Sequence, residues 1–237
     1  MKLLVAVKSC PRDLKNGCHE AIRQTWGKDF QWYSFGLRKI DLKFFVGTAE
    51  IDVPVLQEDE VVVKVPTDTL ESLPDETKQI AKFAVEKGYD FVFLCDNDTF
   101  IRPDRLLACG FEHFDYCGQF EPGYNGLPRQ NFQDGRLGNI GTVWPYCSGG
   151  VGYFLSRRAA ELVAEMPIVH YAEDLCVGQV LSPLVAQGKL SAFQPMQFEK
   201  YAAWHFCTWG HTKYQWPHSV GFDPRWQYES YVRGAGE

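Results

Sequence analysis

Two carboxylates stand one residue apart directly after a short apolar run. The run, Phe91–Leu94, is rich in aromatic residues and is typical of a buried strand. Asp96 and Asp98 follow it and bracket Asn97. Carboxylates at the carboxyl end of a strand in an α/β sheet are well placed to hold a hard divalent cation, which in turn holds phosphate. Acidic triplets are also common in solvated turns, so the rest of the chain must decide between these interpretations.

A second pair of acids, Glu173-Asp174, opens a segment with a helical pattern. The structural interpretation of this pair is that acidic side chains stabilise the positive end of a helix dipole. Upstream, Gly149-Gly150 comes just before an apolar segment that reads as a strand. Glycine lets the backbone approach a ligand closely, and the alternative is a simple turn. Both pairs are therefore candidates for chemistry with an ordinary structural alternative.

Alternating strand and helix patterns run through the first hundred residues. Strands are predicted at residues 2–7, 42–46, 60–65 and 91–94. Helices are predicted from about Asn16 to Trp26 and from about Leu73 to Lys87. This alternation predicts an α/β fold with a mostly parallel central sheet and helices on both faces.

The second half of the chain contains a long segment without a helical period. Residues 119–146 are rich in Gly, Asn, Gln, Arg and Pro, and we predict a loop, which at this length is usually functional or disordered. Around it we predict a helix from Pro103 to about Cys109, a strand at Val151–Leu155, and helices at Arg157–Glu165 and about Glu173–Gln187. With no internal repeat or linker, residues 1–237 are predicted to form a single domain.

Composition excludes some classes of function. The 237 residues carry a net charge of −6 and no run of Lys or Arg, which argues against a general nucleic-acid binder and gives no support for an anionic-membrane patch. No apolar stretch approaches the ~20 residues that span a bilayer. The apolar run after Met1-Lys2 is too short for a signal peptide. We therefore expect a cytoplasmic protein, with a trimmed lumenal domain as the alternative.

The eight cysteines show no C-x-x-C spacing, so the usual pattern of a zinc site is missing. Cys95 and Cys176 occupy apolar positions of their segments and are predicted to be buried thiols. An even number permits disulfides, but the missing signal sequence argues against them.

Four segments in collinear order resemble the inverting β-1,3-glycosyltransferase family, glycosyltransferase family 31, which includes β-1,3-galactosyltransferases, the fringe enzymes and the core 1 synthase. The segments are Glu20–Gly27 (E-A-I-R-Q-T-W-G), Leu94–Phe100 (the D-D-D-x-F metal segment with Asn97 as the middle residue), Pro145–Ser156 (P-Y-C-S-G-G-V-G-Y-F-L-S) and Glu173–Gly178 (E-D-L-C-V-G). The resemblance spans roughly residues 2–181, and the chain beyond Leu190 does not align.

The resemblance implies a GT-A fold, a UDP-sugar donor, Mn²⁺ (or Mg²⁺) as cofactor, and inversion at the anomeric carbon. A divalent metal would stabilise the departing diphosphate as a Lewis acid. Asp98 is expected to ligate the metal directly. Asp96 is also expected at the metal, where it would act through a water molecule, or else at the ribose. Asn97 removes one charge from the family's triple acid. A late histidine completes the metal set, with His205 as the candidate and His211, His218 or a purely structural role as alternatives.

Inverting transfer requires a base that takes the proton of the acceptor hydroxyl as it attacks. By position in the family motif, Asp174 fills this role, with Glu173 as the alternative. Gly149 and Gly150 are expected to lie against the donor sugar.

The expected nucleotide site draws on several further residues. Its members are Ser9, Arg23, Lys78, Asp96 and Asn97, together with the two glycines. Arg23 could equally pair with a structural acid. Trp204, Trp209 and Trp216 suit sugar stacking, although burial beneath a terminal cap is the more frequent fate of such residues.

These observations predict a metal-dependent inverting hexosyltransferase that uses a UDP-hexose and forms a β-1,3-type linkage on a glycan. About residues 1–100 would bind the nucleotide and about 101–237 the acceptor, with residues 119–146 lining the acceptor cleft. A non-catalytic glycan- or nucleotide-binding relative and a metal-dependent phosphohydrolase are the alternatives. A modified nucleic acid ranks below a glycan as acceptor, and a cytoplasmic enzyme of this kind suggests a bacterial or viral origin. Donor sugar and oligomeric state stay open.

Overall fold

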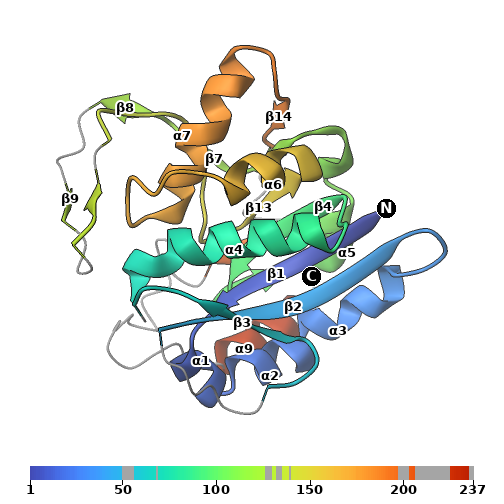
Figure 1. The fold of residues 1–237 in the computed structure, drawn as a ribbon. Helices are drawn as coiled ribbons and strands as arrows, with labels where there is room; N and C mark the ends of the chain where they lie inside the picture. The colour runs from blue at the N-terminus through green and yellow to red at the C-terminus, as the bar shows by residue number, and fades with distance from the viewer. Residues whose placement is uncertain are drawn as a thin grey trace.

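A seven-stranded sheet forms the centre of the fold (Figure 1). The computed structural model describes residues 1–49, 56–67, 69–125, 130–131, 135–138, 140–196, 203–205 and 225–234. The strand order is β14-β6-β13-β4-β1-β2-β3. The bounds are β1 Lys2–Ser9, β2 Lys39–Thr48, β3 Glu60–Lys64, β4 Phe91–Asp96, β6 Tyr116–Gly118, β13 Tyr153–Ser156 and β14 Ala192–Phe193.

The sheet is mostly parallel. β1 pairs in parallel with β2 and β4, β2 with β3, and β14 with β6, whereas β13 runs antiparallel to both β4 and β6. β1 is covered on both faces, because Leu4 and Ala6 belong to one hydrophobic core and Leu3, Val5 and Val7 to the other. A strand buried on both faces has a continuous apolar sequence, which is why the N-terminal run was recognisable.

Helices cover both faces of the sheet, as predicted (Figure 1). On one face lie α4 Leu73–Glu86, α6 Arg157–Ala164 and α7 Glu173–Ala186. On the other lie α2 Cys18–Gln24, α3 Trp26–Asp29, α5 Pro103–Leu107 and α9 Arg225–Gly234. The described chain also contains three short 3-10 helices, η1 Phe30–Tyr33, η2 Leu70–Ser72 and η3 Phe111–His113. The α/β class is thus confirmed by the structure itself.

The helix predicted at about 16–26 is wrong as a single element. The chain instead forms α1 Pro11–Lys15, then α2 and α3 with a break at Thr25, whose φ is −111° and ψ −121°. The Thr25 hydroxyl donates to the Ala21 carbonyl over 2.7 Å. A threonine side chain that bonds back to the preceding turn competes with the backbone ladder, and such residues bend or end helices.

The predicted loop at 119–146 is also corrected, because its described residues form a long β-hairpin. Three short antiparallel ladders join β7 Phe120–Glu121 to β12 Tyr146–Cys147, β8 Tyr124–Asn125 to β11 Thr142–Val143, and β9 Gln130–Asn131 to β10 Leu137–Gly138. Two-residue strands are too short to show an alternating pattern, so the sequence did not reveal them. The hairpin extends away from the sheet beside α7 (Figure 1).

The base of this hairpin is anchored on α7. Ile140 and Val143 form a small apolar cluster with Leu175. A Cβ at Gly178 would lie 2.6 Å from the Cβ of Tyr146, so only glycine permits this close approach. The hairpin is therefore attached to the same helix that begins with Glu173-Asp174.

Two further expectations concern membranes and cysteines. Among the helices that the structure describes, none is long and apolar enough to cross a membrane. The seven cysteines in these ranges are free thiols, and Cys95 and Cys176 are buried, as predicted. Cys207 lies outside the described residues.

Candidate active site at the carboxyl edge of the sheet

The two acid pairs meet at Lys8, a residue that the sequence did not single out. Lys8 stands opposite Asp96 in the β1–β4 register, near the carboxyl end of both strands. Its Nζ lies 3.0 Å from Asp96 Oδ1 and 2.5 Å from Glu173 Oε1. Burial alone would lower the pKa of this lysine, but the charges of Asp96 and Glu173 raise it above its usual value. Lys8 is therefore a buried cation that joins the carboxyl end of β4 to α7.

Glu173 is held at both of its oxygens. Besides the contact with Lys8, its Oε2 accepts a hydrogen bond of 2.6 Å from the Tyr153 hydroxyl, and the residue is only 3% exposed. A Cβ at Gly149 would collide with Glu173 Oε1, so the glycine makes room for this carboxylate. The arrangement suits an acid with a structural and electrostatic role better than one that must take up a proton.

Asp174 is half-buried and more lightly held. Its Oδ2 accepts from the backbone N–H of Gly149 over 3.1 Å, and its Oδ1 accepts from the N–H of Leu175 over 2.8 Å. Burial, and then the neighbouring charge of Glu173, raise the pKa of Asp174 to about 7. A carboxyl group with a pKa near neutrality is well matched to general-base catalysis, because it can both accept a proton and release it again.

The turn formed by Gly149 and Gly150 also contacts the segment that follows β4. The hydroxyl of Thr99, one residue after Asp98, donates to the Gly150 carbonyl over 2.7 Å. Gly149 bonds to Asp174 on its other side. The segment that contains Asp98 runs from β4 to β5 (Thr99–Ile101). The Gly149-Gly150 turn therefore connects this segment to the start of α7.

Asn97 is matched to an acid elsewhere in the chain. Its side-chain amide donates to Asp13 Oδ2 over 3.0 Å and to Ser9 Oγ over 3.2 Å, and all three residues are buried. An aspartate at position 97 would place a second carboxylate against Asp13. Asp98, next along, is only 5% exposed, whereas the Asp96 side chain is 26% exposed. An asparagine at position 97 thus has a local electrostatic reason.

Behind Ser9 a chain of hydrogen bonds runs to Arg23. His19 lies 2.7 Å from Ser9 Oγ through Nε2 and 2.8 Å from Glu60 Oε1 through Nδ1. Burial lowers the pKa of His19, which keeps the ring neutral, so Nδ1–H donates to Glu60 and Nε2 accepts from Ser9. Arg23 bonds to Glu60 over 2.7 Å and forms two bonds with Asp59. Ser9 and Arg23 therefore belong to one polar network, in which Ser9, His19 and Glu60 are buried.

The remaining expected site residues lie on α4, on a short strand or outside the described residues. Lys78 is half-buried on α4, and within the described chain its side chain makes no hydrogen bond or ion pair. In the antiparallel pairing of β5 with β15 (Ala203–His205), the backbone of His205 stands opposite Thr99. Trp204 stands opposite Phe100 in the same ladder. His211, His218, Trp209 and Trp216 lie outside the described residues.

A further buried glutamate lies near Lys8 and was missed by sequence reasoning. Glu76, in the first turn of α4, accepts from the backbone N–H of Ser9 over 3.2 Å. Burial raises its pKa to about 8, against the opposing effect of Lys8. The available signal for Lys8 was a charged residue at the end of an apolar strand. Glu76 gave no such signal, because an acid in the first turn of a helix is ordinary.

The carboxylates fit a metal held jointly with a substrate. Among the residues placed by the structure, no group of three or more His, Cys, Asp or Glu is arranged to hold a metal ion. Mg²⁺-like cations are usually held by one or two carboxylates plus the phosphates of the substrate, rather than by a cage of protein ligands alone. Asp96 and Asp98 supply such a pair of hard oxygen donors.

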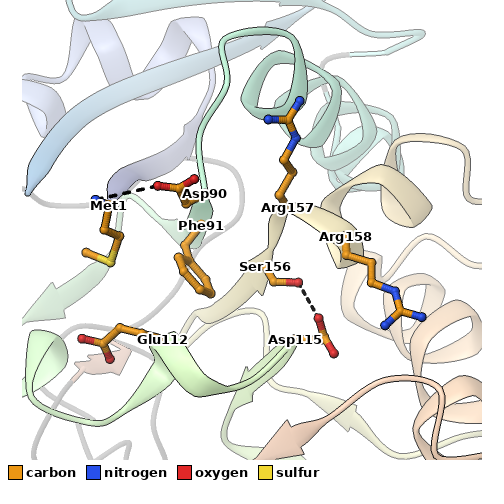
Figure 2. A pocket seen from close by; sticks show the side chains of 8 residues that line it. All are labelled: Met1, Asp90, Phe91, Glu112, Asp115, Ser156, Arg157 and Arg158. Carbon is orange, nitrogen blue, oxygen red and sulfur yellow. Dashed lines mark hydrogen bonds and ion pairs between the residues drawn. The ribbon is translucent and has the colours of Figure 1, made fainter.

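A pocket of about 490 Å³ lies at the opposite end of β4 (Figure 2). β4 begins at Phe91, which lines the pocket, and ends at Asp96. The pocket walls carry charges of both signs, including Arg157 and Arg158. In Figure 2 the hydroxyl of Ser156 donates to Asp115, at 2.7 Å. This pocket shares no residue with the acid pairs.

The chain has distant similarity to a curated protein and to several solved structures. No protein-family model matches the chain. A curated relative, hydroxyproline O-galactosyltransferase GALT2 of Arabidopsis thaliana, is 24% identical over 208 residues, which cover 81% of this chain. The match covers 29% of that relative, so this chain spans less than a third of its length.

Among solved structures, the chain is distantly similar to galactosyltransferase LgtC, solved with donor and acceptor sugar analogues. The TM-score is 0.45 at 11% identity, with 98% of this chain and 96% of that chain covered. A nucleoside-diphosphate-sugar pyrophosphorylase from Vibrio cholerae has a TM-score of 0.35 at 12% identity, with coverages of 82% and 91%.

Proposed function

We propose that this chain is a metal-dependent inverting glycosyltransferase with a GT-A-type fold, which transfers a hexose from a UDP-sugar to an acceptor hydroxyl. The observation that supports this most is the placement of Asp174. It is a half-buried acid whose pKa is raised to about 7, and its neighbour Glu173 is joined through Lys8 to Asp96. Glu173, next to the proposed base, and Asp96, the carboxylate proposed to act on the diphosphate side, thus stand on either side of one buried cation.

In the proposed reaction, the acceptor hydroxyl attacks the anomeric carbon as UDP leaves from the opposite face. Asp174 takes the hydroxyl proton during attack. The metal, held by Asp96 and Asp98, would stabilise the charge of the leaving diphosphate as a Lewis acid. Lys8 and Tyr153 hold Glu173 in place, and the glycine turn positions Asp174 through the N–H of Gly149.

The relative's name guides the choice of substrates. We propose UDP-galactose as the first donor to test, and either a glycan hydroxyl, with a β-1,3-type linkage, or the hydroxyl of hydroxyproline as the first acceptors. UDP release from a UDP-hexose with Mn²⁺ would support the transferase. Phosphate release from simple esters would support a phosphohydrolase instead, and binding without turnover would support a non-catalytic relative.

Replacement of Asp98 by Ala is expected to abolish the Mn²⁺-dependent part of UDP binding. Loss of contacts outside the ligand shell already costs about 10–100-fold in metal affinity, so loss of a direct ligand should cost more. Calorimetry of UDP binding with and without Mn²⁺ measures the effect. Asp104→Ala is the control, since that side chain is 50% exposed at the start of α5 and lies outside the site. Unchanged Mn²⁺ dependence in a folded Asp98→Ala chain would remove Asp98 from the metal site.

The rate of transfer is expected to fall as the pH drops below about 7. The pKa of Asp174 is raised to about 7, so protonated Asp174 accumulates below that pH and cannot accept the hydroxyl proton. The measurement is kcat/KM from about pH 5.5 to about 8.5, where log(kcat/KM) should rise with a slope near one on the acid side. A rate that does not change across this range would contradict Asp174 as the base.

A further inference from the structure

The C-terminal helix places one fully buried amide beneath the metal segment. Gln227 of α9 has 0% exposure. Its Nε2 donates to the carbonyl of Asn97 over 3.1 Å and to the carbonyl of Thr99 over 3.1 Å. These two carbonyls belong to the residues on either side of Asp98. One side chain therefore holds the backbone before and after the expected metal ligand.

The orientation of this amide is determined by a third contact. The indole Nε1–H of Trp26 donates to Gln227 Oε1 over 2.9 Å, and Trp26 is also fully buried. An indole N–H can only donate and a backbone carbonyl can only accept. The amide oxygen must therefore face Trp26, and both N–H bonds must face the two carbonyls.

The turn is held on another side as well. The hydroxyl of Thr99 donates to the Gly150 carbonyl. With Gln227 on the carbonyls of Asn97 and Thr99, the segment that carries Asp98 is held by two elements far apart in the sequence. Buried carbonyls that lose their donors carry a penalty of about 1–3 kcal/mol each, so the turn should change shape when the amide is removed.

We propose that Gln227 is a positioning residue that sets the conformation of the turn 96–99 and, through it, the direction of the Asp98 carboxylate. Affinity for the metal and for the donor then depends on a helix more than a hundred residues away in the sequence. The link to metal binding rests on the proposed function. The link between Gln227 and the shape of the turn does not.

Two variants of the full chain test the proposal. Gln227→Met keeps the length of the side chain and removes both donors, and Gln227→Glu keeps the shape and replaces the amide nitrogen with oxygen. We expect either to weaken Mn²⁺-dependent UDP binding by about 10–100-fold in calorimetry. Amide hydrogen exchange across residues 95–101, without ligand, should become faster. The pH dependence of transfer should not change, because Asp174 is untouched.

Tyr231→Phe is the matched control on the same helix. It removes the hydrogen bond of 3.2 Å from the Tyr231 hydroxyl to Asp29 and so loosens α9 without touching the turn. We expect Mn²⁺-dependent UDP binding to stay as in the wild type. Trp26→Phe tests the same idea from the other side, because loss of the indole donor frees the amide to turn over. Its effect should be smaller than that of Gln227→Met and should not add to it.

The outcomes separate the two proposals. A folded Gln227→Met chain with unchanged UDP and Mn²⁺ affinity overturns the positioning role, as does an equal loss in Tyr231→Phe. If neither Gln227 variant folds, a Trp26→Phe chain with unchanged affinity and exchange overturns it. A wild-type chain that binds no UDP with Mn²⁺ contradicts the proposed function. In that case the exchange rate at 95–101 decides the role of Gln227 in the turn, and an unchanged rate overturns it.

Discussion

Replacement of Asp174 by Asn is expected to lower the rate of transfer by about 10²–10⁴-fold and to leave the affinity for UDP-sugar and Mn²⁺ nearly unchanged. This is the usual cost of losing a positioned base, roughly 3–5 kcal/mol of barrier. Asparagine preserves the volume and still accepts from the N–H of Gly149, so the turn should keep its shape. Single-turnover kinetics with calorimetry of donor binding separates the two effects. The acid limb of the pH profile should also disappear.

The matched comparison is Glu173→Gln, which should retain more activity than Asp174→Asn. Glu173 is bonded at both oxygens and 3% exposed, so it is poorly placed to receive a proton from an acceptor. The reverse ranking would assign the base to Glu173. Full transfer by both variants would remove the pair from the mechanism.

Replacement of Lys8 by Met is expected to destabilise the fold by about 3–5 kcal/mol, the usual cost of removing one member of a buried ion pair. Without Lys8, the buried Glu173 carboxylate loses its cation, and Asp96 loses its ion pair with Lys8. Transfer should be lost as well, because both sides of the site lose their common partner. Urea unfolding at pH 7 measures the change in the free energy of unfolding.

Lys82→Met provides the control for this substitution. The Lys82 side chain is 66% exposed on α4, and its ion pair with Glu86 is 3.9 Å long, so the change should stay within about 0.5 kcal/mol. The double variant Lys8→Met/Glu173→Gln should recover part of the lost stability, since it removes the charge of the buried carboxylate that lost its cation. Wild-type stability in Lys8→Met would show that the bridge contributes nothing to the fold.

The central elements could be predicted because the burial of each element gives its own sequence a recognisable pattern of apolar residues. β1 and β4 are buried on both faces and read as continuous apolar runs, and α4 buries Ile80, Ala81 and Ala84 at helical spacing. The break at Thr25 and the hairpin between residues 120 and 147 were missed. The break results from one hydrogen bond of a side chain to the backbone, and the hairpin results from pairing between two-residue strands. Neither leaves a periodic signal.

The sequence by itself determined which acids are candidates for chemistry and in what order they occur. Short motifs carry this information because the end of a strand, a glycine turn and the start of a helix each restrict the residue types at that place. Only the tertiary structure decided that Lys8 joins Asp96 to Glu173, a residue 165 positions away, and that Gln227 of the last helix holds the turn around Asp98. The physical reason is that strand register and helix packing choose which distant segments meet. A pattern along the chain reports how each segment is buried, but not which partner buries it.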